Sequence, residues 1–79
     1  MIKLKVDVAI IFCDKLISIT KTYTKKRRKI TSYDVIVDFI IGEEAYRRTF
    51  QCNSEERQNE LLNMFIKEAI KKPKSISKV

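Results

Sequence analysis

Hydrophobic residues occupy every second position along four stretches of the chain. A period of two is typical of β-strands that bury one face, so each stretch is predicted to form a strand. The stretches are residues 2–12, 16–24, 30–41 and 45–52. Residues 13–15 and the chain's one glycine, Gly42, mark short turns, because glycine accepts a positive φ without a steric penalty.

The same alternation predicts which side chains face the core. The inward set is Ile2, Leu4, Val6, Val8, Ile10 and Phe12 in the first stretch, Ile17, Ile19 and Tyr23 in the second, Tyr33, Val35, Val37, Phe39 and Ile41 in the third, and Tyr46, Phe50 and Cys52 in the fourth. Asp34 and Asp38 fall on the opposite face of the third strand, where aspartate is usually solvated. Four residues separate them, roughly 13 Å along a strand, which is too far for a shared metal ion.

A helical period replaces the alternation toward the C-terminus. Apolar residues recur there at intervals of three and four, at Leu61, Leu62, Phe65, Ile66, Ala69 and Ile70. Asn53 or Ser54 is the expected N-cap, and Glu56 would complete a capping box if Asn53 is the cap. Pro73 ends the predicted helix.

Four strands followed by one helix predict an α+β fold. Short connections make neighbouring strands antiparallel, so we expect a β-meander of about four strands with one C-terminal amphipathic helix packed on one sheet face. Residues 1–72 are predicted to form a single compact domain, and residues 73–79 a flexible basic tail. A homodimer would add core to so small a domain, and an exposed sheet edge offers one way to form it.

The chain is strongly basic, with 17 Lys and Arg against 10 Asp and Glu and a net charge of +7. Such an excess favours encounter with nucleic acid or with an acidic protein. No apolar run approaches the ~20 residues of a membrane-spanning helix, and no signal-peptide pattern is present. We therefore expect a cytoplasmic protein without membrane association, in which Cys13 and Cys52 are buried thiols. A disulfide and half of a metal site are the alternatives for this pair.

The sequence offers little for catalysis. Histidine, the commonest general base and nitrogen ligand of metals, is absent. Cys13 and Cys52 consequently lack the partner of a Cys-His nucleophile, and one glycine cannot form a glycine-rich phosphate loop. The sequence predicts no enzyme, no metal site and no cofactor.

Five consecutive cations lie between the second and third predicted strands: Lys25, Lys26, Arg27, Arg28 and Lys29. Cations so crowded at a hairpin tip cannot all find local partners, so we expect them to project into solvent and to contact phosphates. Further cations could extend this patch across the sheet (Lys21, Arg47 and Arg48) or form a second patch at the helix end (Lys67, Lys71, Lys72 and Lys74). Tyr23 and Tyr33 flank the run and are candidates for stacking on bases.

The function predicted from these features is that of a small, non-enzymatic binding module that contacts the backbone of DNA or RNA through its basic hairpin loop. Cations in a loop position a protein on phosphates but carry little sequence information, so binding should be salt-sensitive and not base-specific. The alternative is a small protein of the phage, virus or plasmid type that inhibits or regulates a protein partner through its exposed sheet edge.

Overall fold

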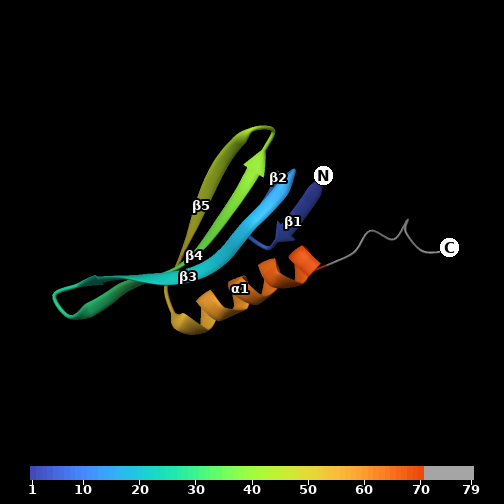
Figure 1. Cartoon of the computed structure of the whole chain (residues 1–79). Coiled ribbons are helices and arrows are strands. Elements are labelled where there is room, and N and C mark those ends of the chain that lie inside the picture. Colours follow the sequence, from blue (N-terminus) through green and yellow to red (C-terminus); the bar gives the residue numbers. More distant parts are fainter. Residues whose placement is uncertain (71–79) are drawn as a thin grey trace.

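The computed structural model describes residues 1–70 and has the predicted α+β architecture (Figure 1). Its elements are β1 (Ile2–Val6), β2 (Ala9–Cys13), β3 (Lys15–Lys26), β4 (Lys29–Ile41), β5 (Glu44–Cys52) and α1 (Glu55–Ile70). β1 and β2 form a two-stranded antiparallel sheet, and β3, β4 and β5 form a three-stranded antiparallel meander. The predicted helix end at Pro73, the tail 73–79 and three of the cations, Lys71, Lys72 and Lys74, lie outside the described residues.

The first predicted strand is wrong, because residues 2–12 form a hairpin and not one continuous strand. β1 and β2 are joined by a two-residue turn at Asp7 and Val8, and Val6 pairs with Ala9. A turn of two residues moves the buried face from even to odd positions, since side chains alternate along each strand. The buried residues are therefore Leu4 and Val6 on β1 but Ile11 and Cys13 on β2. Three residues that were predicted to face inward are instead about half exposed: Val8 (55%), Ile10 (48%) and Phe12 (52%).

A β-bulge at Ile17 produces a second departure from the simple alternation. Leu16 pairs with Phe39 and Ser18 pairs with Asp38, so Ile17 has no partner on β4. The extra residue shifts the face of the strand, and Leu16 and Ile19 both pack against the core. Ile17, predicted to face inward, is 52% exposed.

The third predicted strand departs from expectation at Asp34 and at Ile41, which was predicted to face inward and is 40% exposed. The inward predictions for Tyr23 and Tyr46 on the neighbouring strands are also wrong, since these side chains are 57% and 44% exposed at positions that the core does not cover. Val35, Val37 and Phe39 are buried, and Gly42 begins the turn to β5 with a φ of +63°. Asp34, predicted to be solvated, is only 5% exposed. Its carboxylate accepts hydrogen bonds from the hydroxyls of Thr24 and Ser32, at 3.3 and 3.0 Å, which replace water around the charge.

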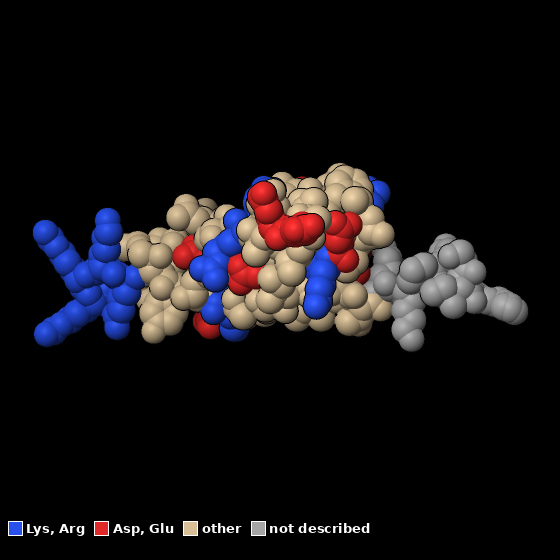
Figure 2. Space-filling model, turned by 45° about the horizontal axis from the view of Figure 1, so that its top comes forward, with Lys and Arg blue, Asp and Glu red and all other residues tan. Residues whose placement is uncertain are grey.

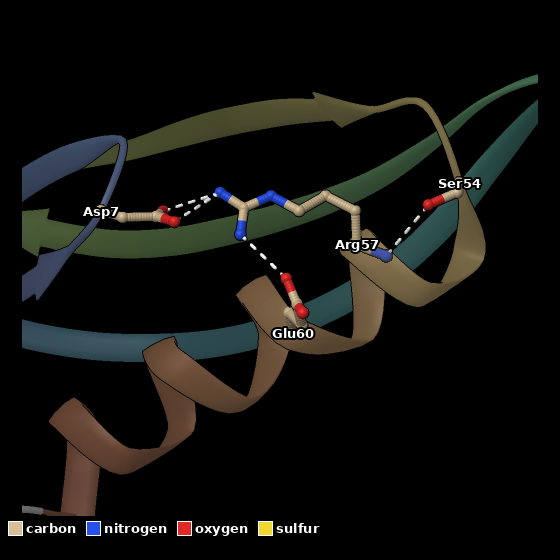
Figure 3. Close-up of polar contacts among 4 residues, drawn as sticks. All are labelled: Asp7, Ser54, Arg57 and Glu60. Carbon is tan, nitrogen blue, oxygen red and sulfur yellow. Dashed lines mark hydrogen bonds and ion pairs between the residues drawn. The ribbon is translucent and has the colours of Figure 1, made fainter.

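The helix begins at a serine cap and is tied to the β1–β2 turn (Figure 3). Ser54 Oγ accepts from the backbone N–H of Arg57 at 3.2 Å, so Ser54 is the cap and the capping box between Asn53 and Glu56 does not form. The Arg57 guanidinium donates to both carboxylate oxygens of Asp7 at 2.8 Å and to Glu60 at 3.2 Å. This fixes the first turns of α1 against the β1–β2 hairpin.

The core lies where α1 and the β1–β2 hairpin meet the β3–β5 sheet. Its buried side chains come from β1, β2, β4, β5 and α1, and Leu4, Val35, Val37, Leu61 and Phe65 are among the most completely enclosed. Gln58 is also buried, and its side-chain amide donates to the backbone carbonyls of Thr22 and Asp34, both at 2.8 Å. No helix within residues 1–70 is long and apolar enough to cross a membrane.

Candidate nucleic-acid interface

The basic run closes the β3–β4 hairpin more tightly than expected. Only Arg27 and Arg28 form the turn, while Lys26 and Lys29 are the last paired residues of β3 and β4. Both arginines have positive φ angles, +50° and +69°, as a two-residue type I′ turn requires. Such turns are usually Asn-Gly or Asp-Gly, because other residues suffer a clash of Cβ with the backbone in this region. The tip therefore combines backbone strain with high charge.

All five cations of the tip are exposed, and none of them has an ion pair within residues 1–70. Lys26 lies directly opposite Lys29 across the hairpin, an arrangement in which like charges repel. Figure 2 shows these basic side chains spread at one end of the molecule, while the acidic side chains in that view gather over the body. A polyanion at the tip would relieve this repulsion. We call these five residues, Lys25 to Lys29, the basic tip.

The arm that carries the basic tip projects beyond the start of α1 (Figure 1). Gln58 contacts the backbone at Thr22, so the part of β3 clear of the helix runs from Tyr23 to Lys26. Four strand residues and the turn give this free arm a reach of roughly 15 Å. All residues from Thr20 to Thr31 are exposed.

Lys21 lies on the same arm, closer to the body. It is exposed, it pairs with Val35 across the sheet, and its Nζ donates to Asn59 Oδ1 of α1 at 2.9 Å. Six residues separate it from Arg27, roughly 20 Å along a strand. Lys21 therefore lies on the arm as an exposed cation that is separate from the tip.

Arg47 and Arg48 lie far from the tip and point to opposite faces of β5. Arg47 pairs with Asp38 at 2.7 Å, which lowers the pKa of that carboxyl and raises the pKa of the guanidinium. Arg48 lies over the ring of Phe50, 5.1 Å from its centroid. Asp38 is nine residues from Lys29 along β4, roughly 30 Å. The structure does not bring these two arginines together with the basic tip.

Tyr23 and Tyr33 pair directly across β3 and β4, on the face of the arm that α1 approaches. They line a groove of about 300 Å³ with Lys21, Ile30, Glu55 and Gln58. The sequence did not predict this groove. The sequence held one sign of a polar contact at this place. Gln58 falls three residues before Leu61 and seven before Phe65, so it lies within the apolar stripe of the helix. A polar side chain buried there needs a specific hydrogen-bond partner.

Other chemistry is sparse in the described part of the chain. Cys13 and Cys52 are buried free thiols, and burial raises the pKa of each. Within residues 1–70 there is no group of three His, Cys, Asp or Glu residues that could hold a metal ion. Lys67, predicted for a second patch, is exposed in the last turn of α1.

No protein-family model matches this chain, and no curated protein or solved structure matches it either.

Proposed function

We propose that this protein binds the sugar-phosphate backbone of nucleic acid through the basic tip of its β3–β4 arm. One observation carries the proposal. Five exposed cations without ion pairs in the described residues are concentrated at the tip of a single hairpin, in the ends of its two strands and in its strained turn. Strained backbone persists where something else requires it, and a turn of Asn-Gly would close the same hairpin without the charge. Arginine at both positions is thus better explained by contact with an anion than by the fold.

The proposal predicts how steeply the affinity for nucleic acid falls as the salt concentration rises. Each phosphate that a cation neutralises releases counterions, with a slope of log K against log salt of about −0.9 per contact for duplex DNA and about −0.7 for single strands. Five contacts give a slope of about −4.5 for duplex and about −3.5 for single strands. Between 50 and 200 mM salt the affinity should fall by about 500-fold and about 130-fold, respectively.

The test compares two variants that each lose three positive charges. One replaces the strand cations of the tip, Lys25, Lys26 and Lys29, with glutamine and leaves the turn intact. The other replaces Lys3, Lys5 and Lys15, which are exposed and remote from the tip. Affinity for a labelled oligonucleotide is measured by fluorescence anisotropy across a salt series.

The tip variant should lose about 2.7 units of the duplex salt slope. The control should keep the wild-type slope, although its lower net charge should weaken binding uniformly. Equal losses in both variants would mean that net charge alone drives binding and would refute the assignment to the tip.

A protein-binding role is the second candidate, and two observations favour it. The outer edge of β5 has no strand partner within residues 1–70, which leaves a row of backbone groups for an added strand. On β2, Ile10 and Phe12 are about half exposed, as is Val8 in the adjoining turn. Sedimentation velocity over a concentration series, with Ile10→Ser/Phe12→Ser as the comparison, would detect a second copy bound at this hairpin.

A further inference from the structure

The groove beside the arm has the composition of a site for a flat, partly polar ligand. Its walls are the paired Tyr23 and Tyr33 of the arm and the first turn of α1 with Glu55. Its volume of about 300 Å³ is at the lower end of the range of small-ligand sites. Tyr23 is 57% exposed and Ile30 is 42% exposed, so apolar surface remains open to solvent here.

The two tyrosines form a stacking surface because the core ends before them. α1 begins at Glu55, and Leu61 and Phe65 belong with Val35 to the buried core, whereas Gln58, the buried α1 residue nearest the helix start, bonds to the backbone carbonyls of Thr22 and Asp34. Tyr33 is partly buried and packs against the edge of the core, which holds its ring in place. Tyr23 lies directly opposite it, with its ring accessible.

The two walls of the groove carry opposite charges, so a phosphate and a base are expected at different places in it. Lys21 and Lys25 are two residues to either side of Tyr23, so all three side chains share one face of β3 at intervals of roughly 7 Å. Phosphates flanking a stacked base would meet these cations. On the opposite wall Glu55 repels phosphate, but its carboxylate can accept a hydrogen bond from an N–H group of a base, such as the imide N–H of thymine.

We infer that this groove binds an unpaired nucleobase stacked on Tyr23 and Tyr33, so that the protein prefers single-stranded to duplex nucleic acid. The inference rests on the proposed function, since the basic tip supplies the contact to the backbone. Bases within a duplex are stacked on both faces, so only an unpaired base can offer its ring to an aromatic side chain. The tip alone would bind either form.

The experiment compares Tyr23→Val with Tyr23→Phe, which keeps the ring. Binding of a labelled oligothymidylate and of a duplex of equal length is measured at fixed salt, with melting temperatures as a check on folding. Loss of one stacked base corresponds to about a five- to 150-fold weaker affinity. Tyr23→Val should show this loss for the single strand and less than about a twofold change for the duplex. Tyr23→Phe should resemble the wild type.

Equal affinity of Tyr23→Val and the wild type for the single strand, or equal losses for both ligands, would overturn the inference and leave the proposed function standing. Failure of the wild type to bind either ligand at low salt would remove the proposed function itself, and the inference with it.

A second measurement does not depend on the folding of Tyr23→Val. The chain has three tyrosines and no tryptophan, so its intrinsic fluorescence reports on Tyr23, Tyr33 and Tyr46. In Tyr46→Phe, which lacks the one tyrosine outside the groove, oligothymidylate should quench the remaining emission and duplex should not. Absence of quenching at saturating oligothymidylate would overturn the inference.

Discussion

Replacing the turn Arg27-Arg28 with Asn-Gly should make the protein more stable and its nucleic-acid binding weaker. Both arginines have φ angles in the left-handed region, +50° and +69°. A residue with a Cβ is disfavoured there by roughly 1–2 kcal/mol relative to glycine, and asparagine tolerates the region better than arginine. The double variant Arg27→Asn/Arg28→Gly keeps the geometry of the turn and removes the strain and two charges.

The gain in stability is smaller than the strain released. Glycine adds conformational freedom to the unfolded chain, which offsets about 0.4–1 kcal/mol of the gain. A net increase of about 1–2 kcal/mol in the free energy of unfolding remains. For a domain of this size, each kcal/mol raises the melting temperature by about 4–8 °C.

Urea unfolding and thermal melting measure the stability, and anisotropy titrations measure binding. The variant should unfold at higher urea while its duplex salt slope shrinks by about 1.8, the share of two contacts. Arg27→Lys/Arg28→Lys serves as the matched control, because it keeps both charges and both strained φ angles; its stability should stay within about 0.5 kcal/mol of the wild type and its salt slope should not change. A variant that is less stable than the wild type would refute the assignment of strain, and an unchanged slope would refute the role of the turn in binding.

Three further predictions concern the body of the domain. Arg57 lowers the pKa of Asp7 below its usual value of 3.8, so the charged Asp7 stabilises the fold above that pH and this contribution is lost as the pH falls through the lowered pKa. Urea midpoints for Asp7→Asn should therefore lie below the wild type at pH 7 and converge with it in acid; a constant difference would contradict the pairing. Phe65→Ala should cost about 3–5 kcal/mol in urea unfolding, because the ring is fully buried and packs 5.3 Å from that of Phe50, whereas a loss under 1 kcal/mol would mean that the helix is not docked as described. Cys13 and Cys52 should react with an aromatic disulfide reagent far more slowly in the native state than in urea, because both are buried and burial raises both thiol pKa values; rapid native reaction would contradict their burial.

Periodicity predicted the strands well where strand pairing is regular. It failed at the two-residue turn between β1 and β2 and at the bulge at Ile17. β4 and β5 lie within a residue of the predicted ranges, since their alternation is regular apart from one register shift near the start of β4, where Thr31 has no partner on β3. The β1–β2 turn contains neither glycine nor proline, and Val8 continues the even apolar positions through it. Sequence alternation cannot register the change of face that a two-residue turn imposes, or the shift at the Ile17 bulge.

The basic tip could be predicted because its five cations are adjacent in sequence and any hairpin would present them together. The position of Arg47 and Arg48 relative to the basic tip could not be predicted, because it depends on the register in which β5 pairs with β4. Burial of Asp34 likewise depends on hydroxyls from β3 and β4 that meet only in the folded sheet. The groove needs both the register of Tyr23 with Tyr33 and the docking of α1 through Gln58.

The most direct test of the account is the affinity of the wild-type protein for single-stranded and duplex oligonucleotides, measured by anisotropy from 50 to 200 mM salt. We predict binding to both forms at low salt, with slopes of log K against log salt of about −3.5 for the single strand and about −4.5 for the duplex. We also predict tighter binding of the single strand near physiological salt. No binding at 50 mM salt, or binding that salt does not weaken, would contradict the central role of the basic tip and turn attention to the exposed β5 edge and the β1–β2 hairpin.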